Sequence, residues 1–213
     1  MRYSELQLEL LKMMKPYWDK VISLDLETHV INNQFLSNER ILSISFARRM
    51  SGAFLDKEGI EVKTILLEDD DDESEEYLLI KLNDEIEKIE PLCVTGYGVR
   101  YYDIPLLQLK KRKYNLKIWK VVDLLEATVQ IDLYQFFKYK KFKKLADVLK
   151  SSEYAHLPFR KTKSLITDNR SEKSEVIYQL WKEDKQRLQD YNEGDVHDTL
   201  LLAEKLLIDN EKK

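Results

Sequence analysis

Two acidic residues interrupt the apolar run VISLDLETHV at residues 21–30. Asp25 and Glu27 are two residues apart, a spacing that places both side chains on one face of a β-strand. Two carboxylates held so close repel each other unless one takes up a proton or a cation lies between them. Hard divalent cations such as Mg²⁺ prefer oxygen ligands of this kind. Taken alone, the pair fits either a strand with an acidic, solvated face or one part of a cation site.

A third acidic residue follows a second apolar run, in the segment LCVTGYGVRYYDIPLL at residues 92–107. The pattern predicts a short strand, a turn that contains glycine, and a helix that begins near Asp103. Gly96 and Gly98 would allow another backbone segment to approach closely. Asp103 is therefore either a helix cap or a third carboxylate that faces the first two.

A tyrosine and a fourth carboxylate lie in LQDYNEGDVHDTLLL, at residues 188–202. Tyr191 and Asp195 are four residues apart, so they share one face of a helix. They are either a hydrogen-bonded pair in the core or part of the acidic site. His197 has the chemistry of a catalytic base, but two residues along a helix turn it about 200° away from Asp195. We expect His197 to lie outside the site.

The three segments together resemble the DEDD superfamily of 3′–5′ exonucleases, which share the RNase H-like fold. They are most similar to the proofreading exonuclease domain of family-B DNA polymerases. LDLET resembles the first motif, TGYGVRYYDIPLL the second, and YNEGD the Tyr-x-x-x-Asp (DEDDy) form of the third. The resemblance extends from residue 21 to residue 202. It implies a metal-dependent 3′–5′ exonuclease that hydrolyses phosphodiester bonds at the 3′ end of single-stranded nucleic acid, with DNA favoured.

The resemblance also implies a role for each acidic residue in a two-metal mechanism. Asp25 would bridge two divalent ions, Mg²⁺ or Mn²⁺, and Glu27 and Asp195 would complete one of the two metal sites. Asp103 would support the second ion, largely through water. Tyr191 would orient and help to activate the attacking water.

Four further residues are implied as substrate contacts. Thr28 and Leu26 would lie against the terminal nucleotide, and Tyr102 and Gly98 belong to the second motif. Family-B proofreading domains usually carry, at the position of Gly98, an Asn that helps to place the substrate strand. This departure removes no metal ligand, but it leaves strand placement and substrate preference open.

Basic segments are the candidates for holding a single strand. FFKYKKFKK at residues 136–144 interleaves aromatic residues with lysines, among them Lys138 and Lys140, which could contact phosphates while the rings stack on bases. The alternative is an amphipathic helix with a solvated lysine face and its aromatic residues in the core. FRKTK at residues 159–163, which contains Arg160, is the second candidate. We expect the three tryptophans to pack in the core or an interface.

The composition sets the class of protein. The chain has 213 residues, of which 43% are hydrophobic and 35% are charged, and no apolar stretch reaches the length that crosses a bilayer. The charged N-terminal segment does not resemble a signal peptide. A single cysteine, Cys93, allows neither an internal disulfide nor a thiolate metal site, and we expect it to be buried. These features predict a cytoplasmic protein.

The charge distribution is uneven. The net charge is −4, but the run EDDDDESEE at residues 68–76 holds eight acidic residues, and the rest of the chain has 35 basic against 31 acidic residues. We interpret the run as a solvated loop. The alternative is an electrostatic gate for a polyanion.

The pattern of elements predicts one domain over residues 1–213. A helix over 3–19 precedes three strands, 21–27, 41–48 and 60–67, which form an antiparallel meander. Helices and two further strands alternate after them, and the last forty residues are helical. The expected fold class is α/β, RNase H-like, a mixed β-sheet (antiparallel meander plus parallel strands) with helices on both faces.

Two other functions remain open. One is a catalytically inactive RNase H-like module that binds nucleic acid or a partner protein, and the other is a structure-specific endonuclease on the same fold. All four carboxylates and the tyrosine are present, which favours an enzyme. The expected partners are 3′ ends of single-stranded DNA or RNA and a replication or repair protein complex. We expect no association with a membrane.

Overall fold

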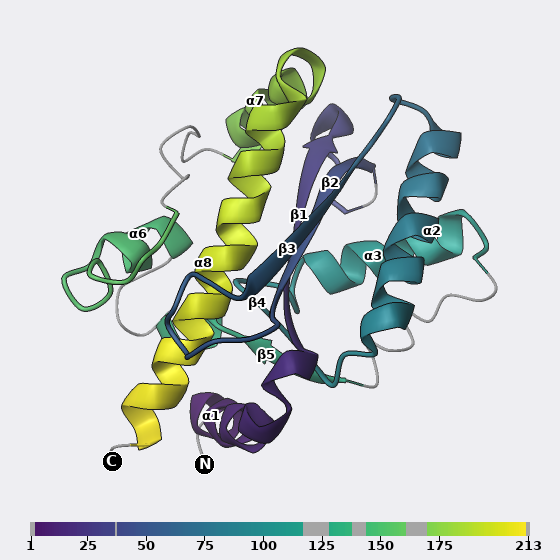
Figure 1. Ribbon diagram of the computed structural model, residues 1–213. Helices are drawn as coiled ribbons and strands as arrows, with labels where there is room; N and C mark the ends of the chain where they lie inside the picture. Colours follow the sequence, from purple (N-terminus) through teal and green to yellow (C-terminus); the bar gives the residue numbers. More distant parts are fainter. Residues whose placement is uncertain (1–2, 37, 117–127, 138–143, 161–169, 212–213) are drawn as a thin grey trace.

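The computed structural model describes residues 3–36, 38–116, 128–137, 144–160 and 170–211, and it contains a five-stranded mixed sheet (Figure 1). The strand order is β3-β2-β1-β4-β5. β1 pairs with β2 and β2 with β3 in antiparallel fashion, whereas β1–β4 and β4–β5 are parallel pairs. The expected meander followed by parallel strands is thus confirmed. The strands are β1 (Val21–Val30), β2 (Glu39–Arg49), β3 (Ile60–Leu66), β4 (Cys93–Gly96) and β5 (Val129–Asp132).

Helices cover both faces of the sheet, as expected (Figure 1). α8 crosses one face over four of the strands, with α1 beside it, while α2 and α3 lie on the other face. α7 packs against β1. No helix in the described ranges is long and apolar enough to span a membrane. The helices are α1 (Tyr3–Met14), η1 (Lys15–Lys20), η2 (Ile31–Asn33), α2 (Asp72–Ile89), α3 (Asp103–Lys113), α5 (Tyr134–Phe137), α6 (Leu145–Lys150), α7 (Arg170–Glu183) and α8 (Lys185–Glu211).

The two faces of β1 carry different kinds of side chain, apolar on one face and acidic on the other. Ile22, Leu24 and Leu26 are buried in the core that includes apolar residues of α2 and α3. Because side chains alternate along a strand, Asp25 and Glu27 leave the opposite face, where α8 packs. The register of β1 against β2 shifts immediately after Glu27, a bulge of the kind often found beside active sites. The strand therefore delivers its carboxylates toward α8 while its other face anchors it in the core.

Two predicted elements end differently from expectation. The N-terminal α-helix stops at Met14, and a 3₁₀ segment with Pro16 in its first turn completes the connection to β1. The acidic run is a loop only as far as Asp71, because α2 begins at Asp72. The Asp71 carboxylate accepts a hydrogen bond from the Ser74 amide at 2.7 Å, and acidic residues in a first helical turn are favoured by the helix dipole. The loop interpretation is therefore wrong for residues 72–76.

Candidate active site

Three carboxylates converge where β1 and α8 meet. Asp25, Glu27 and Asp195 each offer an oxygen that lies within 4.8 Å of the others. Glu27 is 2% exposed and Asp195 is 3% exposed, and Asp25 is partly buried. Anions concentrated in this way repel one another in a medium that screens charge poorly, so the arrangement favours a cation among them. Hard divalent ions suit an all-oxygen ligand set, and the residues present fit such an ion.

Asp103 lies beside this group as the first residue of α3. Its Oδ1 accepts a hydrogen bond from the Leu26 amide at 3.0 Å, which holds it against β1 between Asp25 and Glu27. Burial raises the pKa of Asp103 to about 7, and the nearby charge of Glu27 acts in the same direction. The structure thus brings Asp103 to the acidic site and does not place it at the cap position of α3. We call Asp25, Glu27, Asp103 and Asp195 the carboxylate centre.

Tyr191 lies one helical turn before Asp195 and is 2% exposed. Burial raises the pKa of its phenol well above the ordinary value, and the charges of Asp195, Glu27 and Asp25 add to this effect. The phenol therefore keeps its proton at neutral pH and can donate a hydrogen bond.

Lys173 of α7 was not anticipated from the sequence. Its ammonium group lies 3.1 Å from each oxygen of the Glu27 carboxylate. Burial alone would lower the pKa of Lys173, but Glu27, Asp25 and Asp195 together raise it, so the side chain stays charged. The chain contains 35 Lys and Arg residues, and no local signal marks this one, because only the packing of α7 on β1 brings it to the site.

A cavity of about 430 Å³ opens beside the carboxylate centre, within the size range of small-molecule sites. The predicted substrate contacts Leu26, Thr28, Gly98 and Tyr102 all line it. We call this cavity the active-site pocket. Its remaining lining residues are Asp25, Glu27, Val30, Tyr97, Asp103, Lys173, Ser174 and Ile177.

Glycine is required at positions 96 and 98 of the second motif for two different physical reasons. A side chain at Gly96 would come within 2.6 Å of the Val99 Cβ and 3.0 Å of the Leu24 carbonyl oxygen, so the close approach expected there is observed. Gly98 has open space around it but a φ of +92°, which a residue with a Cβ rarely adopts. Its amide donates to the buried Asp132 carboxylate at 2.9 Å, which fixes the turn. Close approach therefore explains Gly96, and backbone conformation explains Gly98.

The basic residues predicted to contact a nucleic-acid strand do not line the active-site pocket or fall outside the described residues. Lys138 and Lys140 fall outside the described residues. Phe137, in the same basic segment, is fully buried and packs edge-on against Tyr154 at 5.6 Å, as the amphipathic alternative predicts for an aromatic residue. Arg160 lines a second cavity and not the active-site pocket. Its guanidinium lies 3.2 Å from the Glu193 carboxylate.

His197 lies away from the carboxylate centre. It is 2% exposed, its Nδ1 is 3.0 Å from the Asp198 carboxylate, and it lines the same second cavity as Arg160. The Asp198 oxygen also accepts the Arg160 amide at 2.8 Å. This placement matches the expected direction of the side chain on α8.

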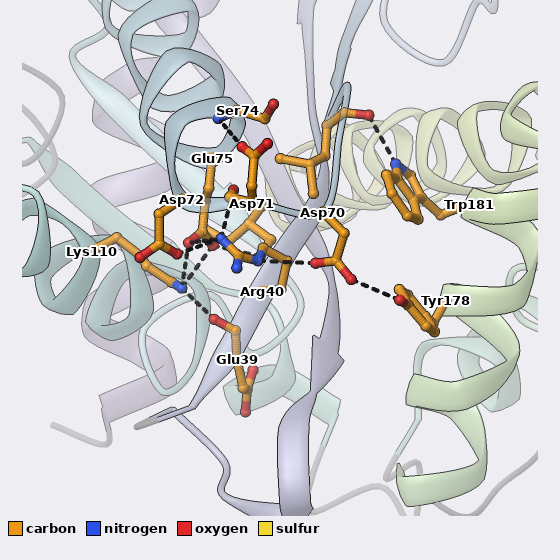
Figure 2. A network of polar contacts seen from close by, with 12 residues as sticks. Glu39, Arg40, Asp70, Asp71, Asp72, Ser74, Glu75, Lys110, Tyr178 and Trp181 are labelled. Atoms are coloured by element: carbon orange, nitrogen blue, oxygen red, sulfur yellow. Dashed lines mark hydrogen bonds and ion pairs between the residues drawn. The ribbon is translucent and has the colours of Figure 1, made fainter.

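A second group of acidic side chains surrounds Glu75 at the start of α2 (Figure 2). Glu75 is completely buried and accepts hydrogen bonds from the Ile41 amide and from Lys110, each at 2.8 Å. Arg40 pairs with Asp72 at 2.8 Å and with Glu75 at 3.3 Å. Basic residues from β2 and α3 thus neutralise this end of the acidic run. The Glu75 cluster consists of Arg40, Asp70, Asp72, Glu75, Lys110 and Lys113.

Comparison with solved structures identifies the class of fold. The chain is similar to the family B DNA polymerase from the hyperthermophilic archaeon Pyrobaculum calidifontis, with a TM-score of 0.61 and 19% sequence identity. The match covers 88% of this chain and 24% of the polymerase. It confirms the RNase H-like α/β fold, and at this identity it supports the fold alone.

Comparison with protein families identifies the family. Residues 33–207 match the family described as a predicted 3′–5′ exonuclease related to the exonuclease domain of PolB, and the chain belongs to that family. The expected relationship is thereby confirmed. A comparison with curated proteins gave no match. The family match begins at residue 33, after β1, and therefore does not include Asp25 and Glu27. The structure, and not this match, places these two residues beside Asp195.

Proposed function

We propose that this single domain is a metal-dependent 3′–5′ exonuclease that removes nucleotides from the 3′ end of single-stranded nucleic acid, with DNA favoured. The observation that carries the proposal is the convergence of Asp25, Glu27 and Asp195, whose oxygens lie within 4.8 Å of one another beside a pocket. Membership of a family of predicted 3′–5′ exonucleases supports the same activity.

The carboxylate centre would hold two divalent ions, Mg²⁺ or Mn²⁺. Asp25 would be shared between them, Glu27 and Asp195 would complete one site, and Asp103 would support the other. When bound, such ions stabilise the charge that develops on the attacking and leaving oxygens of an in-line displacement.

The chain's own residues would orient the reactants. Tyr191 keeps its proton and shares a hydrogen bond with Asp195, so its phenol would help to orient the attacking water beside that carboxylate. Lys173 would supply a fixed positive charge next to Glu27, where the phosphate of the substrate must approach. Leu26 and Thr28 would lie against the terminal nucleotide, since both line the pocket next to the carboxylates.

The test is cleavage of a 5′-labelled single strand in Mg²⁺ or Mn²⁺, with EDTA as the metal-free condition. A ladder that shortens from the 3′ end supports the proposal. Internal cuts would indicate an endonuclease, and binding that is insensitive to EDTA without any cleavage would indicate an inactive binding module. Both results would contradict the proposal.

A matched pair of variants on α8 assigns the activity to the site. Asp195→Asn should abolish cleavage, whereas Asp190→Asn, which changes an exposed carboxylate five residues earlier on the same helix, should leave it intact. Equal activity of the two variants would show that the assignment of the site is wrong.

A further inference from the structure

We propose that Asp132 is a positioning residue of the carboxylate centre. Acting through the turn at residues 97–102, it would hold Asp103 against β1 and so set the affinity of the centre for the cation that Asp103 supports. This role rests on the proposed function, and it adds to the machinery a residue that does not line the active-site pocket.

Asp132 is the last residue of β5, and its side chain is completely buried. β5 pairs in parallel with β4, and Asp132 lies opposite Gly96, the last residue of β4. Neighbouring parallel strands end at the same edge of a sheet. The Asp132 carboxylate therefore lies beside the turn that follows β4 and leads to Asp103.

Backbone amides hold the Asp132 carboxylate. Its Oδ1 accepts the Gly98 amide at 2.9 Å and the Tyr134 amide at 3.0 Å. Burial raises the pKa of Asp132, while the amides of Gly98, Tyr134 and Arg100 favour its ionised form. Its Oδ2 is buried without a hydrogen-bond partner in the part of the chain that the structure describes. The hydrogen bonds of this side chain are thus directed to the turn after β4 and to the start of α5.

Gly98 connects Asp132 to Asp103. Its amide donates to Asp132, and its carbonyl oxygen accepts the amides of Tyr101 at 2.9 Å and Tyr102 at 3.2 Å. Asp103 follows Tyr102 directly as the first residue of α3. The position of the Gly98 backbone, which Asp132 fixes, therefore determines where α3 begins and where Asp103 lies.

Asp103 depends on this placement because it bonds to β1 beyond the end of the strand pairing. β4 pairs with β1 only as far as Ser23, and the Leu26 amide finds its acceptor in Asp103 Oδ1 at 3.0 Å. Hydrogen bonds weaken steeply when their distance and angle change. A shift of the turn would therefore move Asp103 away from Asp25 and Glu27, and the loss of such a supporting contact typically weakens metal binding by about 10- to 100-fold.

The first test is Mn²⁺ binding without nucleic acid, measured by isothermal titration calorimetry. Asp132→Leu keeps the approximate size of the side chain but removes the acceptor, and it should weaken Mn²⁺ binding by about tenfold. Asp132→Asn keeps an oxygen that can accept and should retain part of the affinity. Ile131→Ala, at the preceding, fully buried position of β5, loosens the packing without removing an acceptor from the turn and should bind like the wild type. Unchanged affinity in Asp132→Leu, or an equal loss in Ile131→Ala, would overturn the inference.

A double variant tests whether Asp132 acts through Asp103. Asp103→Asn removes the charge that Asp132 would position, and it should itself weaken Mn²⁺ binding. If the two residues act in series, adding Asp132→Leu to Asp103→Asn should lower the affinity no further, because the effects of coupled residues do not add. A second loss as large as that of Asp132→Leu alone would contradict action through Asp103.

The Leu26 amide reports the position of Asp103 without metal or substrate. In EDTA, its hydrogen exchange should be about tenfold faster in Asp132→Leu than in the wild type, and Ile131→Ala provides the control for general loosening of the fold. Equal exchange in Asp132→Leu and the wild type would overturn the inference.

Failure of the proposed function can be distinguished from failure of this inference. If the protein binds Mn²⁺ but cuts no strand, the exonuclease proposal is wrong, and the pattern of Mn²⁺ affinities still decides the role of Asp132. If the wild type binds no Mn²⁺, the metal-dependent function is wrong, and the exchange of the Leu26 amide decides whether Asp132 positions Asp103.

Discussion

The carboxylate centre and the Glu75 cluster contain similar side chains in opposite electrostatic situations. In the Glu75 cluster, three carboxylates meet three basic side chains, and a hydrogen bond from Lys113, with a second from Arg40, lowers the pKa of Asp72 to about 2. In the carboxylate centre, four carboxylates share one basic residue of the described chain, Lys173, and burial raises the pKa of Asp103 to about 7.

The comparison distinguishes carboxylates that stabilise the fold by pairing with basic side chains from carboxylates that could bind a cation. Where the protein supplies enough positive charge of its own, ionised carboxylates are stabilised and the fold uses them, as at the start of α2 (Figure 2). Where several carboxylates are buried close together, their mutual repulsion costs free energy of folding, and a bound cation reduces that cost. The number of acidic residues in a cluster therefore does not by itself indicate a cation site. The number of basic side chains that pair with them does.

The largest expected effect is loss of activity at the carboxylate centre. Asp25→Asn should lower the first-order cleavage rate by at least about a thousandfold, equivalent to about 4 kcal/mol of transition-state stabilisation. Its thermal stability without metal should not fall, because the change removes one of the mutually repelling charges. Single-turnover cleavage and thermal unfolding in EDTA measure the two effects. Retained activity, or a large loss of stability, would contradict the role assigned to the centre.

The opposite pattern is expected at the Glu75 cluster. Glu75→Gln removes a completely buried charge that Lys110 and Arg40 neutralise, and it takes from the buried Lys110 ammonium the carboxylate with which it pairs. The free energy of unfolding should fall by about 3 kcal/mol, measured by urea denaturation. Cleavage by the folded fraction should be affected little, and a greater loss of activity than of stability would show that the two regions are not separable in this way.

Lys173 should behave as an internal cation. Lys173→Met removes the positive charge beside Glu27 and should lower the melting temperature in EDTA by a few degrees. Saturating Mn²⁺ should reduce this loss, since a bound ion would supply the missing charge. The comparison is a thermal scan of wild type and variant in both conditions. An equal loss with and without Mn²⁺ would mean that Lys173 contributes packing alone.

A pH dependence of stability is expected at Asp103. A pKa of about 7 in the folded protein exceeds the unfolded value near 4, so between these limits the folded state binds a proton that the unfolded state has released. The Asp103 carboxyl therefore destabilises the metal-free protein increasingly as the pH rises from about 4 to 7. Asp103→Asn should be more stable than wild type at pH 8, and the difference should narrow at pH 5. A difference that is constant with pH would contradict this assignment.

The sequence predicted those parts of the molecule that local patterns encode. Strand alternation placed Asp25 and Glu27 on one face, and helical spacing placed Tyr191 with Asp195 and turned His197 away. The meander also followed from short apolar runs and turns. In each case the determining interactions lie within a few residues along the chain.

The residues that sequence reasoning missed depend on long-range packing. Lys173 reaches Glu27 only because α7 docks on β1, and Asp132 reaches Gly98 across 34 positions of sequence. Charge density alone predicts a solvated loop for the acidic run, but Asp71 caps α2, and basic residues of β2 and α3 pair with acidic residues of the run. Such pairings appear only when distant segments are brought together.

Bound Mn²⁺ can be located by its anomalous scattering in crystals of the wild-type protein, which tests directly whether the carboxylate centre binds a cation. We expect anomalous density between Asp25, Glu27 and Asp195, and none in the Glu75 cluster, where basic side chains balance the carboxylates. Density confined to the acidic run at residues 68–76, or its absence from the carboxylate centre at saturating Mn²⁺, would show that the buried carboxylates of β1 and α8 are not the metal site.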